Sequence, residues 1–426
     1  PVQTAQHQKA DTMPKKNTTS NTTIMNRADE DNLTQEYAKF RNERISNVHY
    51  QLELNISKDT HFQGLAHITF HLSKNDQPIT FDKKNITVHE LLVNKKSFPI
   101  HNEKFIITLP TEILSSDNEI TIRYTAQTTQ TGEGLHRFID PVDQKTYMYT
   151  DLEPYEARRI FPCFDQPDIK ATFESKVIVP SPFLVVSTTP QSNAIQKGDT
   201  TEFTFEKSLP MSSYLFSLFV GDWSVWENTY NDIPLRMLAR QSLKDKMDPD
   251  WWFDITKRGL AFYESYFAYP YPYKKLDQIL APEYNHGGME NVAAISYGDQ
   301  YIFRHIPTED DYRQRSGLVL HEMAHQWFGD IVTMKWWDDL WLNESFASYL
   351  AYLAMVKATP HTSAWEEFSL KVKSWAYITD ASLVSHPIEG EVNSTNDAMN
   401  NFDGITYGKG AAVLQQLAFY IGEEEF

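Results

Sequence analysis

The stretch His321-Glu322-Met323-Ala324-His325 lies within residues 318–328, which contain no proline or glycine and are rich in apolar residues. This pattern predicts a helix over residues 311–328. Four residues along a helix turn about 400° and rise about 6 Å, so both imidazoles leave one face, one turn apart. Such a pair suits two neighbouring corners of a zinc tetrahedron. Glu322 lies beside them, near enough to reach a metal-bound water without itself binding the metal.

A third ligand is expected from the next helical stretch, residues 340–357, which carries Glu344 eighteen residues after His325. Gly329 and Asp330 end the first helix, and residues 331–339 can turn the chain back. An antiparallel second helix then presents Glu344 to the same metal. Two histidines and one glutamate leave a fourth position open for water, as in catalytic zinc sites. We therefore predict one catalytic Zn²⁺ per chain, held by His321, His325 and Glu344.

This ligand set predicts a hydrolytic reaction. A bound zinc lowers the pKa of water towards 7 and polarises a carbonyl group. Glu322 is the candidate general base, which takes the water proton and later passes it to the leaving amine. The oxyanion that forms needs a hydrogen-bond donor. Spacing alone does not single out that donor among 22 tyrosines and 14 histidines.

Composition narrows the class of protein. The 426 residues predict two or three domains. Hydrophobic residues make up 41% and charged residues 23%, which excludes wholesale disorder. The net charge of −18 argues against a nucleic-acid partner. Cys163 is the sole cysteine, so any metal must be held by His, Asp or Glu. No apolar run reaches the eighteen or so residues of a transmembrane segment.

Three regions follow one another along the chain. Residues 1–40 are polar and without apolar periodicity, which predicts a flexible tail. Residues 41–226 alternate like short strands separated by turns, which predicts an antiparallel β domain. Residues 227–426 are strand-rich first and helical later, which predicts an α+β domain. The expected strands are 49–56, 65–72, 105–109, 120–124, 171–179, 183–187, 201–205 and 233–238, and the expected helices are 250–267, 311–328, 340–357 and 363–377.

Several motifs together resemble the M1 zinc aminopeptidases, most closely the bacterial aminopeptidase N-like members. Gly287-Gly288-Met289-Glu290-Asn291 matches that family's exopeptidase motif, and it precedes the metal-binding stretch as in the family. The resemblance runs from about residue 45 to the end of the chain. Its other matching stretches are GEGLHRF at 132–138, ARRIFPCFDQP at 157–167, WWDDLWLNESF at 336–346 and YGKG at 407–410.

The resemblance implies a multidomain fold, with a saddle-like N-terminal β domain followed by a thermolysin-like α+β catalytic domain. It also implies that Glu290 and Glu153 bind the free α-amine of a peptide substrate, and that the hydroxyl of Tyr407 stabilises the oxyanion. A peptide α-amine is largely protonated at neutral pH, so two carboxylates can hold it by charge-assisted hydrogen bonds. That clamp sets the substrate register. The rest of the motif, Gly287, Gly288 and Met289, is expected to line the substrate site.

Two features depart from the family pattern. His286 precedes the glycine motif, where relatives line the pocket for the first side chain. It either narrows that pocket and adds pH dependence or only caps the turn. The chain also ends 19 positions after Tyr407, whereas relatives usually continue into a large helical region. We therefore expect a piece of a longer parent protein, whose missing C-terminal helices help to wall the cavity.

Alternatives remain open at this point. A thermolysin-type zinc endopeptidase shares the metal ligands but needs neither Glu290 nor Glu153. A bifunctional epoxide hydrolase of one M1 branch carries glutamine at the position of Glu153, so the glutamate argues against it. A non-catalytic scaffold, or a fragment inactive without its C-terminal region, is the remaining class. The sequence leaves both an exported and a cytoplasmic location open.

Overall fold

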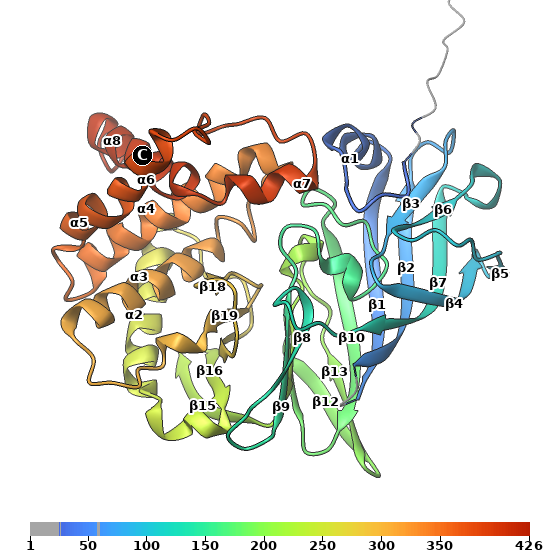
Figure 1. The fold of residues 1–426 in the computed structure, drawn as a ribbon, viewed down its shortest axis with the longest axis horizontal. Helices are drawn as coiled ribbons and strands as arrows, with labels where there is room; N and C mark the ends of the chain where they lie inside the picture. The colour runs from blue at the N-terminus through green and yellow to red at the C-terminus, as the bar shows by residue number, and fades with distance from the viewer. Residues whose placement is uncertain (1–24, 26, 58–59) are drawn as a thin grey trace, which may run out of the picture.

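A computed structural model describes residues 25, 27–57 and 60–426. It divides into a strand-rich part and a helical part that lie side by side (Figure 1). The prediction of a multidomain chain, mostly strands followed by a helical domain, is confirmed. Among the described residues, no helix combines the length and the apolar character needed to cross a bilayer.

The strand-rich part contains two larger sheets and a two-stranded ladder. The first has the strand order β12-β13-β10-β1-β2-β7-β4-β5 and the second the order β11-β14-β9-β8, while β3 pairs with β6. The strands are β1 (Ile45–Ile56), β2 (His61–Leu72), β3 (Ile79–Asp82), β4 (Ile86–Val93), β5 (Lys96–Ser97), β6 (Ile106–Leu109), β7 (Asp117–Gln127), β8 (Gly134–Ile139), β9 (Thr146–Asp151), β10 (Ala171–Pro180), β11 (Leu184–Ser187), β12 (Gln191–Lys197), β13 (Thr200–Phe205) and β14 (Leu218–Gly221).

Alternation of apolar residues explains these strands. In β10 every second residue is buried, because side chains of a strand point to opposite faces. Two properties of this part differ from what the sequence predicts: one concerns strand direction and the other the pattern of short strands. The pair β1 and β10 is parallel, and the chain passes through β8 and β9 of the second sheet before β10 pairs with β1. Short strands such as β3, β9 and β14 carry no clear alternation, because they are buried on both faces.

The helical part begins with a five-stranded sheet in the order β15-β16-β17-β19-β18. Its strands are β15 (Trp223–Tyr230), β16 (Ile233–Arg240), β17 (Leu276–Ala281), β18 (Gly288–Met289) and β19 (Ala294–Gly298). The helices of the molecule are α1 (Gln35–Asn42), α2 (Pro249–Phe267), α3 (Glu309–His325), α4 (Leu340–Ala358), α5 (Ala364–Glu367), α6 (Lys373–Asp380), α7 (Thr395–Ala398) and α8 (Gly410–Ile421).

Helix α3 is held between α2 and α4. It begins with a capping box, in which the Thr308 side chain accepts from the backbone N–H of Asp311 and the Asp311 carboxylate accepts from the backbone N–H of Thr308. Gly259 of α2 lets the two helices approach, because a Cβ there would lie 2.8 Å from side-chain atoms of Leu320 and Met323. The helix is therefore fixed by its cap at one end and by close packing along its length.

The predicted tail is only partly testable. Residues 1–24 and 26 lie outside the described residues. From Arg27 onwards the prediction of a flexible tail is wrong. Arg27 contacts Asp82, Leu33 is completely buried, and α1 begins at Gln35. These contacts are made with residues 50 to 360 positions away, so local polarity gave no sign of them.

Three boundaries also differ from the predicted ones. The expected border at 226/227 falls inside β15, which pairs with β16 along its whole length; we propose that the domain border lies just before β15. Helix α3 ends at His325, three residues earlier than predicted, because the chain turns back so that Asp330 N–H donates to the His325 carbonyl. The expected helix 363–377 is interrupted by a π-helical turn, η7 (Phe368–Val372).

Candidate active site

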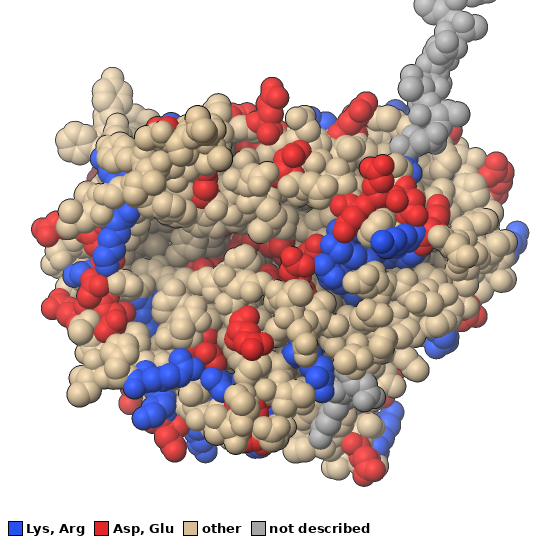
Figure 2. Space-filling model, in the orientation of Figure 1, with Lys and Arg blue, Asp and Glu red and all other residues tan. Residues whose placement is uncertain are grey.

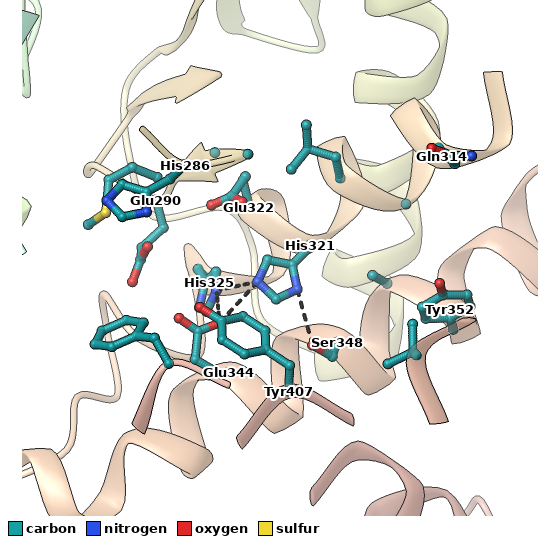
Figure 3. Close-up of a pocket in the computed structure, with 18 of the residues that line it drawn as sticks. His286, Glu290, Gln314, His321, Glu322, His325, Glu344, Ser348, Tyr352 and Tyr407 are labelled. Carbon is teal, nitrogen blue, oxygen red and sulfur yellow. Dashed lines mark hydrogen bonds and ion pairs between the residues drawn. The ribbon is translucent and has the colours of Figure 1, made fainter. Parts of the chain in front are cut away.

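Helices α3 and α4 bring three metal-ligating atoms together. His321 Nε2 lies 3.0 Å from His325 Nε2 and 3.1 Å from Glu344 Oε2, and His325 Nε2 lies 3.4 Å from the same oxygen. All three side chains turn toward one point (Figure 3). Neighbouring corners of a zinc tetrahedron with 2.0–2.1 Å bonds are about 3.3 Å apart. The three atoms therefore have the spacing that a zinc ion requires.

The tautomer of His325 also fits a metal ligand. Its Nδ1 lies 2.9 Å from the carbonyl oxygen of Phe328 and 2.8 Å from Oδ1 of Asn343. Both are acceptors, so in the neutral imidazole that a metal would bind the proton belongs on Nδ1 and Nε2 keeps its lone pair. Asn343 in turn donates from Nδ2 to Glu290 Oε1 at 3.0 Å. One amide thus joins a histidine of the metal group to a carboxylate of the substrate motif.

Glu322 lies against the backbone of β18. A Cβ added at Gly288 would fall 2.4 Å from Glu322 Oε1, so only glycine leaves room for that carboxyl group. Glu322 does not belong to the group formed by His321, His325 and Glu344, but it lies within 4.8 Å of His325 and Glu290. Burial raises the pKa of Glu322 well above its usual range. This position suits a carboxyl group that contacts a water molecule bound to a metal without itself binding the metal.

Tyr407 reaches the same point from the end of the chain. It lies in the π-helical turn η9 (Ile405–Lys409), and its ring stacks on His321 at 6.0 Å between centroids. A Cβ at Gly410 would clash with the Ser345 hydroxyl, which explains how this turn comes so close to α4. Ser345 also donates to the Thr406 carbonyl at 2.5 Å. Burial, followed by the charge of Glu344, raises the pKa of Tyr407, so the hydroxyl stays protonated.

Two further carboxylates close one end of the site. Glu290 is 2% exposed, and Gln326 donates to its carbonyl at 3.0 Å. Glu153 follows β9 after two residues, and its Oε1 is buried without a hydrogen-bond partner among the described residues. Burial, together with the charges of Glu290 and Glu344, raises the pKa of Glu153 well above its usual range. This end of the site therefore gathers carboxyl groups that have no lysine or arginine partner among the described residues.

The balance of charge differs between the ligand atoms. Burial disfavours a charge on His325, but the charges of Glu290 and Glu344 outweigh burial and raise the pKa of His325 well above its usual range. Burial would raise the pKa of Glu344, yet His325 and His321 lower it overall. Glu344 is thus the ionised carboxylate of the metal group, as a zinc ligand must be.

These side chains line one cavity of about 480 Å³, and all eleven site residues named from the sequence lie on it. Figure 2 shows it as a hollow with acidic side chains at its inner end. His286 and Glu290 stand at one end and Tyr352 and Gln314 at the other (Figure 3). The predicted residues on the wall are Glu153, His286, Gly287, Gly288, Met289, Glu290, His321, Glu322, His325, Glu344 and Tyr407.

Comparison with known proteins agrees with this geometry. Residues 46–215 match the peptidase M1 N-terminal domain, and residues 251–426 match the peptidase family M1 domain. The chain belongs to peptidase family M1. The M1 relatives include an aminopeptidase N from Streptomyces lividans, 39% identical over 93% of this chain and 47% of its own length.

Two more distant M1 proteins give the same result. A probable aminopeptidase 1 from Sulfurisphaera tokodaii is 32% identical over 86% of this chain and 46% of its own length. A glutamyl aminopeptidase from Rattus norvegicus is 30% identical over 93% of this chain and 44% of its own length. The chain thus spans about half the length of the curated relatives it matches.

Sequence reasoning missed several residues that act on the predicted ones. Asn343 directly precedes the predicted ligand Glu344. That position could have suggested that Asn343 supports the metal group. Ser348 lies one turn beyond Glu344, with its hydroxyl 3.4 Å from His321 Nδ1. Asp151 stands two residues before Glu153 and contacts His286. No pattern in the sequence distinguishes Ser348 and Asp151 from ordinary polar residues.

Proposed function

We propose that this chain is the catalytic part of a zinc-dependent aminopeptidase that removes the N-terminal residue of peptides. The observation that carries the proposal is the convergence of His321, His325 and Glu344 at 3.0–3.4 Å, beside a buried Glu322 and two unpaired carboxylates. The family membership and the names of the relatives support it.

His321, His325 and Glu344 hold one zinc ion in this proposal. A zinc ion, when bound, supplies a Lewis acid that lowers the pKa of water and polarises a carbonyl. Glu322 takes a proton from the attacking water and delivers it to the leaving amine. The Tyr407 hydroxyl donates to the oxyanion, which is consistent with its raised pKa.

Glu153 and Glu290 bind the substrate's ammonium group in this proposal. Their carboxylates share the end of the cavity, and an ammonium between them supplies the missing positive charge. Because the amine is held there, only the first peptide bond lies over the metal group. Gly287, Gly288 and Met289 form the adjoining wall, along which substrate backbone can lie.

The test is hydrolysis of aminoacyl-aminocoumarins, with and without a chelator, followed by addition of zinc, alongside N-acetylated controls. We expect chelator-sensitive cleavage of the free-amine substrates alone. Cleavage of acetylated peptides at internal bonds would instead support the thermolysin-type endopeptidase. One bound zinc without turnover would mean that residues outside this chain are needed for activity.

A further inference from the structure

A second cavity, of about 240 Å³, adjoins the active-site cavity and shares Glu153, His286 and Met399 with it. It extends from the proposed amine clamp toward the strand-rich part of the molecule. A substrate whose α-amine is held at Glu153 has this space beside its first side chain. The chemistry of its wall therefore bears on which N-terminal residue the site accepts.

Among the described residues, the charged groups of this wall are paired except for two carboxyl groups, Glu153 of the proposed amine clamp and Asp151. Lys84 lies 3.0 Å from Asp31 and 3.2 Å from Glu156. Arg158 also pairs with Asp31, and Arg159 pairs with Glu133 at 2.8 Å. Asp151 has no lysine or arginine partner among the described residues. It is 3% exposed, and its Oδ1 is buried without a hydrogen-bond partner there.

Among the described residues, the one basic side chain that contacts Asp151 is His286, whose Nε2 lies 3.5 Å from Asp151 Oδ2. Burial lowers the pKa of His286, so this imidazole is mostly neutral at neutral pH. It cannot serve as a permanent counter-ion. Burial and the charges of Glu133, Glu156 and Glu290 raise the pKa of Asp151 to about 8, as expected for a carboxyl group that lacks a cation.

We infer that Asp151 is a specificity-determining residue that selects substrates with a cationic first side chain, arginine or lysine. His286 lies beside Asp151, where the two cavities adjoin. The inference rests on the proposed aminopeptidase function. Asp151 and Glu153 are two residues apart, so their Cα atoms are separated by no more than about 7 Å. One substrate residue can therefore place its α-amine at Glu153 and the charged end of its stem at Asp151.

The test compares kcat/KM for arginyl-, lysyl-, leucyl- and methionyl-aminocoumarin in the zinc-loaded protein. We expect arginine and lysine to be preferred over leucine, and Asp151→Asn to reduce that preference about 10- to 100-fold. The change should appear mainly in KM for the cationic substrates. The kcat/KM of the variant for the leucyl substrate should stay within about threefold of the wild-type value. Glu133→Gln is the matched control, because Glu133 lines the same cavity but is paired with Arg159.

The pH profile gives a second readout. The ratio of arginine to leucine hydrolysis cancels the groups common to both reactions, and it should rise as pH increases from 6 to 9, because Asp151 becomes ionised. Several titratable groups interact with Asp151: Glu133, Tyr149, Glu153, Glu156, Tyr284, His286 and Glu290. His286→Ala should leave the direction of this rise unchanged, since the carboxyl group and not the imidazole binds the cation.

Two results would overturn the inference. One is a wild-type preference for leucine over arginine; the other is an equal loss for all substrates in Asp151→Asn. If no substrate is turned over, that result bears on the activity of this chain and not on the role of Asp151. Calorimetric binding of argininamide against leucinamide then decides the inference, with tighter argininamide binding that Asp151→Asn removes as the supporting result.

Discussion

Asp82 in the strand-rich part and Glu322 in the helical part are both buried carboxyl groups, but their surroundings are opposite. Asp82 lies 2.5 Å from Arg41 and 3.3 Å from Arg27, and it also accepts from the Tyr155 hydroxyl at 2.7 Å. Although burial opposes ionisation, these arginines lower the pKa of Asp82. Burial raises the pKa of Glu322, whose cavity also holds Glu290; the arginine on the cavity wall, Arg313, pairs with Glu367 and Asp310 instead.

The contrast separates charges that hold the fold from charges that await a ligand. A buried carboxylate with its cation built in is satisfied by the protein itself, and removing one partner is costly. Carboxylates gathered around a cavity without a fixed cation lower the stability of the empty protein, and they are satisfied by a metal ion or an ammonium group. The following changes are ordered from the largest expected effect to the smallest.

Removal of the metal should have the largest effect on the helical part. Chelation is expected to abolish turnover and to lower Tm, because the gathered carboxylates lose their cation; zinc at 100 times its Kd stabilises a protein by about 2.7 kcal/mol. Thermal unfolding with metal analysis measures this. The Tm of Glu344→Gln, which lacks one of the three proposed ligands, should rise little when zinc is added. An unchanged Tm in a demonstrably metal-free protein would contradict the prediction.

Glu322→Gln should separate activity from stability. We expect kcat to fall about 10²- to 10⁴-fold, because the amide cannot accept the water proton. Zinc content should persist, and Tm should not fall, because the substitution removes a buried carboxyl that lacks a cation. Steady-state kinetics and calorimetry on the same preparation provide both values. Retention of more than a tenth of kcat would exclude Glu322 as the general base.

Asp82→Ala should show the reverse pattern. It leaves Arg41 buried and unpaired, so we expect a loss of about 3 to 5 kcal/mol in the free energy of unfolding. Residual folded protein should retain its kcat. Denaturant titration measures the loss. The control is Glu90→Gln, which removes an exposed ion pair with Arg123 and should cost no more than about 1 kcal/mol. Equal losses in both variants would refute the assigned role of Asp82.

Gly288→Ala tests how closely β18 positions Glu322. Because the new Cβ would lie 2.4 Å from Glu322 Oε1, the carboxyl group must move, and we expect kcat to fall about 100-fold. Gly287→Ala is the neighbouring control, since its Cβ would meet atoms no nearer than 3.3 Å. Its loss should stay below tenfold. Similar rates for the two variants would show that the close contact is unimportant.

The smallest of these effects is expected for Asp151→Asn, which should change how the stability of the folded protein depends on pH. The pKa of Asp151 is raised to about 8 in the folded protein, above its unfolded value. The folded state therefore binds the proton more tightly, and wild-type stability is lost as pH rises toward 8. The variant should therefore become steadily more stable relative to wild type as pH rises from 5 to 8.5. The prediction would be wrong if the Tm values of wild type and variant changed in parallel across that pH interval.

Much of this molecule follows from local pattern. Alternation located β1, β2, β10 and β13, and helical periodicity located α2, α3 and α4 to within a few residues at most ends. These elements are long and bury one face or stripe, so their period is visible in the sequence. The segment 27–40 was misread as a tail, because its ordering depends on Asp82 and Thr395, which are remote in sequence.

The sequence by itself predicted the candidate metal group, since the spacing of His321 and His325 is a property of one helix and Glu344 follows in the next. It also determined the family, through motifs spread over both parts. Only the tertiary structure decided that Gly288 lies against Glu322, that Asn343 joins His325 to Glu290, and that Asp151 is left without a cation. Those relations arise where separate elements pack together, and the identity of a buried charge's partner depends on that packing.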